Sequence, residues 1–360
     1  MPPLESHKVQ CKASRNASLT PRIDYPQPQK EYTVKICSLL PSGTEIVYAL
    51  GLGDHLIGVS DLCDYPSEAG YKPVISRSRI DTTVLSSAEV EAVMRSLLER
   101  GESPFHIDAE ALRQAPPELV LTQDTCAICD AAAADVQRAL DGIRPAPELL
   151  ILSPRTVAEI FASIIAVGRA AGVPDRARTL VAELEARVRA VTSIASRAQH
   201  RPRLMSLEGV NPMVAGGHWI PELKRLAGGR DDLFSPGCAA QRLEWATVRD
   251  YDPEILLITP CSSGLERSLR ELDYLAEQDG WWELQAVRAR EVYVIDHVYF
   301  SRPGPRVVDG LELLAQIVHP TCFSGMIPDG SVRKLELAAG QTCSPAALAD
   351  AFAPYPGVWV

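Results

Sequence analysis

The feature that most constrains the fold is a strand–helix–strand unit near the start of the chain. An apolar run of strand length, residues 34–40, is followed by a helical pattern that ends at Gly51. Ser42, with Glu45 three residues later, is a capping-box signature for that helix. A second apolar run, residues 56–59, follows it. Because parallel strands need such a crossover, the pattern predicts a parallel sheet.

The same alternation recurs along most of the chain and predicts an α/β fold with two lobes. Further strands are expected at 119–122, 149–152, 203–207, 255–259 and 292–295. Between the two halves, residues 154–198 are almost wholly helical, with Pro174 as the interior break. We therefore expect two Rossmann-like lobes with parallel sheets, joined by one long rigid helix.

The composition of the two ends sets the predicted boundaries. The first residues are rich in proline and basic side chains, which is typical of a disordered leader, and the last forty hold many glycines and prolines. The predicted units are a leader at 1–32, an N-terminal lobe at 33–153, a spine helix at 154–173, a C-terminal lobe at 174–320 and a peripheral extension at 321–360.

Charge and composition exclude several classes of partner. A formal net charge of −10 argues against binding to nucleic acid or to an anionic membrane surface, since both need a basic face. The sequence contains neither an apolar run of membrane-spanning length nor a secretory signal. Its nine cysteines are spread along the chain, often in apolar runs, as reduced core thiols are. We expect a monomeric cytoplasmic protein, or an organellar one if the basic leader directs it there.

The stretch from residue 299 to residue 306 is the strongest candidate for a ligand site. It follows the apolar strand at 292–295 and opens a helix, so it lies at the carboxyl edge of a sheet, where ligands bind. Tyr299 and Phe300 offer aromatic faces and Arg302 a guanidinium group, which together suit a large, partly apolar ligand. The alternative interpretation is an ordinary helix start with arginines exposed to water.

Four segments together carry a resemblance to a known family: residues 38–45, 61–66, 216–223 and 299–306. Over roughly residues 33–320 the chain resembles the cobalamin-binding branch of the periplasmic-binding-protein-like family, which serves ABC importers for vitamin B12, haem and iron-siderophores. The resemblance implies two lobes with the ligand in the cleft between them. It also implies ligand contacts from Pro41, Ser42, Thr44, Asp64, Tyr65, Tyr299, Phe300 and Arg302.

Four further residues could contact a ligand or a metal. His218 follows two glycines that allow close backbone approach; its imidazole could be an axial ligand to cobalt or iron, or could be bonded to backbone at a helix start. Trp219 beside it offers a stacking surface. Cys126 and Cys129 form a CxxC after a strand, which is compatible with loop thiols, half a metal site or a redox pair.

These observations predict a binding protein for a corrinoid or a related tetrapyrrole or metal chelate, acting as an intracellular carrier or an importer-derived binder. No catalytic constellation is found, so the alternative, a redox or metal-handling enzyme using Cys126 and Cys129, is the weaker hypothesis. No cofactor is expected. The resemblance implies that Glu110 docks on an ABC permease, but Ala246 stands at the matching place in the second lobe, which puts delivery to a permease in doubt.

Overall fold

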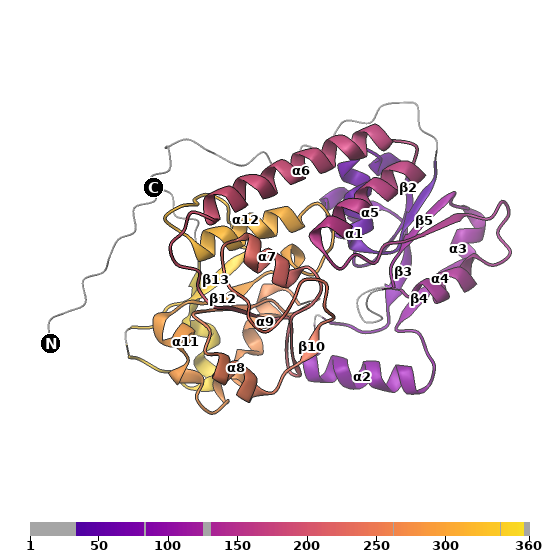
Figure 1. The fold of residues 1–360 in the computed structure, drawn as a ribbon. Coiled ribbons are helices and arrows are strands. Elements are labelled where there is room, and N and C mark those ends of the chain that lie inside the picture. The colour runs from indigo at the N-terminus through magenta and orange to yellow at the C-terminus, as the bar shows by residue number, and fades with distance from the viewer. Residues whose placement is uncertain (1–33, 83, 125–130, 262, 339, 356–360) are drawn as a thin grey trace, which may run out of the picture.

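A computed structural model describes residues 34–82, 84–124, 131–261, 263–338 and 340–355. The chain folds into two α/β lobes that lie side by side, as Figure 1 shows. The predicted fold class, α/β with two Rossmann-like lobes, is confirmed, but the sheets also contain antiparallel pairs in addition to the expected parallel strands. The leader expected at 1–32 lies outside the described residues.

The first lobe is built on a six-stranded sheet in the order β4–β3–β2–β1–β5–β6. All neighbouring strands are parallel except β3 and β4. The sequence patterns predict most of this sheet but miss β3. The strands are β1 Ile36–Ser38, β2 Leu56–Ser60, β3 Val74–Ser78, β4 Phe105–Ile107, β5 Leu119–Thr122 and β6 Glu148–Ile151. The helices of this lobe are α1 Pro41–Ala49, α2 Ser87–Glu99, α3 Ala109–Gln114 and α4 Ala133–Leu140.

The second lobe is built on a five-stranded sheet in the order β14–β13–β12–β11–β7. Its parallel part is β7 Leu204–Leu207, β11 Ile255–Ile258 and β12 Val292–Ile295. A small antiparallel sheet adjoins it, formed by β8 Gly209–Val210, β9 Met213–Ala215 and β10 Gln241–Arg242. The helices are α7 Ile220–Leu226, α8 Trp245–Tyr251, α9 Leu265–Arg270, α10 Leu272–Ala276, α11 Gln285–Ala289 and α12 Val307–Val318.

The segment after residue 320 departs from the sequence-based expectation. It was expected to be a peripheral extension, yet it supplies β13 Val332–Leu335 and β14 Phe352–Pro354, both antiparallel members of the second sheet. Val332, Leu335 and Phe352 are buried there. The glycines and prolines that suggested a loose tail mark the turns around these short strands.

The connection between the lobes is a pair of helices, α5 Val157–Ala170 and α6 Pro174–Ala195. The longer of the two is α6, with 22 residues, and it lies beyond the range 154–173 expected for the spine. Figure 1 shows α6 running along one side of both lobes. The two helices pack closely because Gly168 faces Ala177, where an added Cβ would lie 2.3 Å from the Ala177 Cβ.

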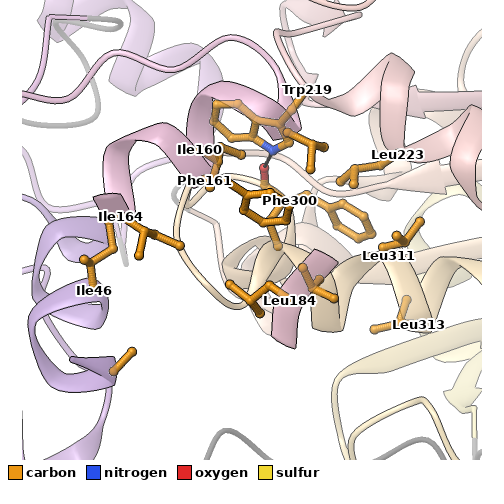
Figure 2. Packing of buried hydrophobic residues seen from close by; sticks show 14 of the residues in the cluster. Ile46, Ile160, Phe161, Ile164, Leu184, Trp219, Leu223, Phe300, Leu311 and Leu313 are labelled. Atoms are coloured by element: carbon orange, nitrogen blue, oxygen red, sulfur yellow. Dashed lines mark hydrogen bonds between the residues drawn. The ribbon is translucent and has the colours of Figure 1, made fainter. Parts of the chain in front are cut away.

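One hydrophobic core is continuous between the two lobes. Figure 2 shows side chains of α1, α5 and α6 packed with those of α7 and α12. Ile46 and Ile160 belong to the same cluster as Leu184, Leu223 and Leu311, and all five are almost completely buried. Because the cluster takes residues from both lobes, it holds them at a fixed separation along the α6 side.

A buried ion pair also joins the lobes. Arg306, at the start of α12, donates to the Glu45 carboxylate of α1 through Nε at 3.0 Å and Nη2 at 2.5 Å. Burial alone would lower the pKa of Arg306, but the hydrogen bonds to Glu45 outweigh it and raise that pKa above the ordinary arginine value. Glu45 therefore forms no capping box. Ser42 lies inside α1, whose N-cap is Leu40.

Replacing Arg306 with Ala should destabilise the protein by roughly 3–5 kcal/mol, because the Glu45 carboxylate would stay buried without its partner. The measurement is the free energy of unfolding from urea denaturation. Arg178→Ala is the matched control, since the Arg178 side chain is 63% exposed and its pair with Asp175 should contribute no more than about 1 kcal/mol. Equal losses in the two variants would contradict a structural role for the buried pair.

Candidate ligand-binding site

The cleft between the lobes contains a cavity of about 630 Å³. Both lobes contribute to its walls, so a ligand held there would contact both. The first lobe supplies Pro41, Ser42, Asp61, Leu62, Asp64 and Thr82. The second lobe supplies charged and polar side chains, among them Arg267, Arg270, Asp296, His297, Arg302 and Arg333.

A smaller and more apolar pocket of about 140 Å³ adjoins this cavity. The two share Ser42, Ser301 and Pro303 in their walls. Its apolar lining includes Leu40, Leu152, Trp219, Ile220 and Phe300, and its polar lining includes Gln123, Glu208, His218 and Thr259. A wide polar space that leads into a narrow apolar one suits a ligand with a broad polar part and a smaller projecting group.

The topology explains why polar residues gather at this place. In open parallel sheets, ligands bind beyond the carboxyl ends of the strands. The residue that follows β5 is Gln123, the one after β7 is Glu208, and the one after β11 is Thr259. Asp296 follows β12 in the same way. Both sheets therefore point their carboxyl ends at the cleft.

A glycine pair shapes the loop that carries His218. Glu208 is buried and accepts hydrogen bonds from the backbone N–H groups of Gly216 at 3.1 Å and Gly217 at 2.9 Å. An added Cβ at Gly217 would lie 2.4 Å from Glu208 Oε2, so a larger residue cannot make this approach. Burial raises the pKa of Glu208. The loop is thus built around a buried carboxyl group, whose signal in the sequence is its position directly after β7.

The imidazole of His218 lies at the edge of the smaller pocket. Its ring stacks on Trp219 with 5.8 Å between ring centroids. His218 has a positive φ of 49°, a conformation that non-glycine residues rarely adopt. Burial, followed by the nearby charge of Arg155, lowers the pKa of His218, so the ring is neutral at pH 7. A neutral imidazole keeps a nitrogen lone pair that can bind a metal.

The structure brings most of the predicted ligand residues to the two cavities. Those that line one or both are Pro41, Ser42, Asp64, His218, Trp219, Phe300 and Arg302. Trp219 and Phe300 differ from the expectation of open stacking faces, because both are nearly buried and belong to the shared core. Figure 2 shows the Trp219 indole N–H donating to the Phe300 carbonyl, at 2.9 Å.

Three predicted ligand residues lie outside the lining of both cavities. Thr44 is fully buried, and its hydroxyl contacts the Cys63 Sγ at 3.1 Å. The Tyr65 ring covers the guanidinium of Arg306 at 3.9 Å, so its aromatic face is already occupied. Burial raises the pKa of Tyr299 to about 12. These side chains support the walls of the cleft instead of facing its interior.

The guanidinium of Arg302, in the second lobe, is bound to acidic side chains of the first lobe. It pairs with the Asp64 carboxylate, with Nη2 and Oδ2 3.0 Å apart, and lies 3.7 Å from Glu45 Oε1. Burial would raise the pKa of Asp64, but the hydrogen bond from Arg302 outweighs it and lowers that pKa. Arg302 therefore positions the two lobes as well as lining the cavity, a role that its sequence context does not reveal.

His297 is a cavity residue that the sequence analysis did not single out. Its Nδ1 lies 2.8 Å from the Ser301 hydroxyl. Burial, together with the nearby charge of Arg302, lowers the pKa of His297 to about 3, so the ring stays neutral. Its position two residues after the end of β12 was the available signal.

Cys126 and Cys129 lie outside the described residues. No disulfide joins any two of the cysteines that the structure describes, which are Cys37, Cys63, Cys238, Cys261, Cys322 and Cys343. Within those described ranges, no three His, Cys, Asp or Glu side chains come together as a metal site.

Comparison with known proteins identifies the family. The model of a family described as periplasmic binding protein matches residues 36–299. The chain belongs to this family. Its members bind solutes for ABC transporters and are not enzymes, so the enzyme hypothesis based on Cys126 and Cys129 has no support.

Individual relatives place the chain within the family. It is 26% identical to YvrC of Bacillus subtilis, an uncharacterized ABC transporter substrate-binding lipoprotein, over 82% of each chain. It is 23% identical to the vitamin B12-binding protein of Vibrio parahaemolyticus, over 77% of this chain and 86% of the relative. The periplasmic haem-binding protein RhuT of Roseiflexus has the same fold, with a TM-score of 0.61 at 23% identity, over 81% of this chain and 99% of RhuT.

The expected cytoplasmic placement is wrong for this family. Its description is periplasmic, and one of the relatives is a lipoprotein, so these homologues work outside the cytoplasm. The expectation rested on two sequence observations, the missing export signal and the reduced core thiols. The match to the family model outweighs both. None of the helices in the described ranges is long and apolar enough to cross a membrane.

Trp219→Ala should lower the free energy of unfolding by roughly 3–5 kcal/mol, because it empties a site in the shared core. From the sequence, Trp219 was considered only as a stacking surface beside His218. Thermal and urea unfolding of the free protein provide the measurement. Tyr71→Ala serves as the control, since Tyr71 is 89% exposed and its loss should change stability by less than about 0.5 kcal/mol. If the Trp219→Ala protein were as stable as the parent, Trp219 would instead be an open stacking surface for the ligand.

Proposed function

We propose that the chain binds a corrinoid, or a related tetrapyrrole or metal chelate, in the cleft between its lobes. The observation that carries this proposal is the pair of adjoining cavities lined from both lobes and sharing Ser42, Ser301 and Pro303. The vitamin B12-binding and haem-binding proteins among its relatives support a ligand of this class. Such a ligand combines an apolar macrocycle with a polar rim, and the cleft offers surfaces of both kinds.

We assign the macrocycle and its polar rim to the wider cavity, and a smaller apolar group that projects from the ligand to the pocket beside Trp219 and Phe300. We assign metal coordination at an open axial position to His218, because its ring is neutral and lines the smaller pocket, whereas the Nδ1 of His297 is bonded to the Ser301 hydroxyl. Arg302 and Asp64 would meet the rim as a pair, so their net charge adds little to the selection of a charged ligand.

Ser301→Trp should weaken binding of cyanocobalamin or haemin by about a hundredfold, because the indole would fill the junction of the two cavities. Calorimetric titration gives the affinity and should show one site per chain in the parent. The visible spectrum from the same titration tests coordination, since His218→Ala should shift it if the imidazole is an axial ligand.

Ser67→Trp is the control for the added bulk, because Ser67 is exposed and lines neither cavity. Its affinity should equal that of the parent. If the parent binds neither probe at high micromolar concentration, the proposed ligand class is wrong. Unchanged affinity in Ser301→Trp would place the site elsewhere.

We also propose that the loaded protein docks on an ABC permease through one carboxylate on each lobe. Glu110 lies on α3 with its side chain 65% exposed. On the second lobe Ala246 is exposed on α8, and Glu244, its N-cap residue, is exposed two positions earlier. Glu244 is the acidic group of this lobe that we assign to docking. Two separated ion pairs would fix the orientation of the protein on the permease.

Replacing both Glu110 and Glu244 with Ala should reduce ATP-driven uptake by a reconstituted cobalamin importer about tenfold, without changing ligand affinity. The assay uses this protein as the sole donor. Glu183→Ala, which removes an exposed carboxylate from α6, should leave uptake at the parental rate. Full uptake with the double variant would rule out this docking pair.

A further inference from the structure

A helical arm of the first lobe reaches the second lobe at the rim of the cavity. The arm comprises residues 84–104, between β3 and β4, and its main element is α2. Figure 1 shows α2 set apart from the sheet of its own lobe and close to β10. A contact between Arg242 of β10 and Glu91 of α2 agrees with this view. The arm is therefore a bridge between lobes on the side of the cleft away from α6.

The arm is packed mainly on itself. Its buried side chains, Met94 and Leu97, form a small cluster with Ile80, and Leu85 and Val90 pack against it. Among the described residues, this cluster is separate from the cores of both lobes. A segment with its own small core can move as a unit while exposing little apolar surface of the rest of the protein.

Polar contacts fasten the start of α2 to the second lobe. The Glu271 carboxylate accepts from the Ser87 backbone N–H and from the Ser87 hydroxyl, both at 2.6 Å. Arg267 lies beside it and donates to the Thr82 carbonyl at 2.8 Å and to the Ser87 hydroxyl at 3.2 Å. The Arg267 and Glu271 side chains are only 9% and 11% exposed. We call this group of contacts the latch.

The latch lies directly on the wall of the cavity, because Thr82 and Arg267 both line it. The opposite side of the cleft is closed by the shared core and by the buried Glu45–Arg306 pair. Opening that side would expose a large apolar surface and two charges, whereas opening the latch breaks a few hydrogen bonds and leaves Glu271 beside Arg267, 3.4 Å away. Of the two sides of the cleft, the side closed by the arm therefore opens at the lower cost in free energy.

We propose that residues 84–104 form a gate over the ligand cavity and that Glu271 holds this gate shut. With the latch formed, a bulky ligand can neither enter nor leave past the start of α2. When the contacts of the latch break, residues 84–104 move as one unit, held together by their own hydrophobic cluster. The two lobes keep their relative position. This inference rests on the proposed function, because a gate requires that the cavity hold a ligand.

The test is the variant Glu271→Gln, which keeps the shape of the side chain but removes its charge and one acceptor oxygen. Its association and dissociation rates for cyanocobalamin, measured by stopped flow, should both rise about tenfold, while the dissociation constant changes less than about threefold. Glu277→Gln is the matched control: it makes the same chemical change at an exposed position six residues further on, and its rates should equal those of the parent.

Hydrogen exchange of the ligand-free protein tests the latch without any ligand. Amides of residues 84–104 should exchange about tenfold faster in Glu271→Gln than in the parent, with the remaining amides unchanged. Ser87→Ala, which removes only the hydroxyl contact, should give a smaller increase in the same segment. The proposal is overturned if arm exchange is unchanged, or if exchange accelerates while both binding rates stay at parental values. Failure of the parent to bind cyanocobalamin and haemin would instead refute the proposed function.

Discussion

The contact between Glu45 and Arg306 is the interaction on which the geometry of the cleft depends. It joins the first helix of one lobe to the last long helix of the other, across 261 positions of sequence. Each helix begins beside a loop that lines the cavity, so the same pair sets the distance between Ser42 and Ser301. Burying two charges costs desolvation free energy that their attraction only partly offsets. We interpret the pair as fixing the alignment of the lobes more than adding to net stability.

The parts of the site that the sequence could predict are those determined by local pattern. Apolar runs of strand length locate the parallel strands, and the loops after them lie at the cleft, which correctly places Ser42 and Arg302 there. The same rule, applied to every strand, would also have found Glu208 and His297. The short strands β13 and β14 were not predicted, because the glycine and proline residues around them are typical of a peripheral extension.

Other parts of the site depend on pairings between distant residues, which no local pattern contains. Arg302 forms an ion pair with Asp64, and the Tyr65 ring packs against the guanidinium of Arg306, because the lobes meet there. The resemblance marked these residues as ligand contacts, while the structure shows their side chains holding each other. Trp219 was expected to be a stacking surface for the same reason, yet its apolar ring is more stable in the shared core than in an open cleft.

The helix α12 and the strands β13 and β14 come late in the chain, which has a consequence during synthesis of the protein. A ribosome synthesises the first lobe, α5 and α6 long before α12 and the closing strands of the second sheet. During that interval the faces of α5 and α6 that will bury Ile160 and Leu184 have no partner from the second lobe. The nascent chain therefore carries an exposed apolar ridge until translation is nearly complete.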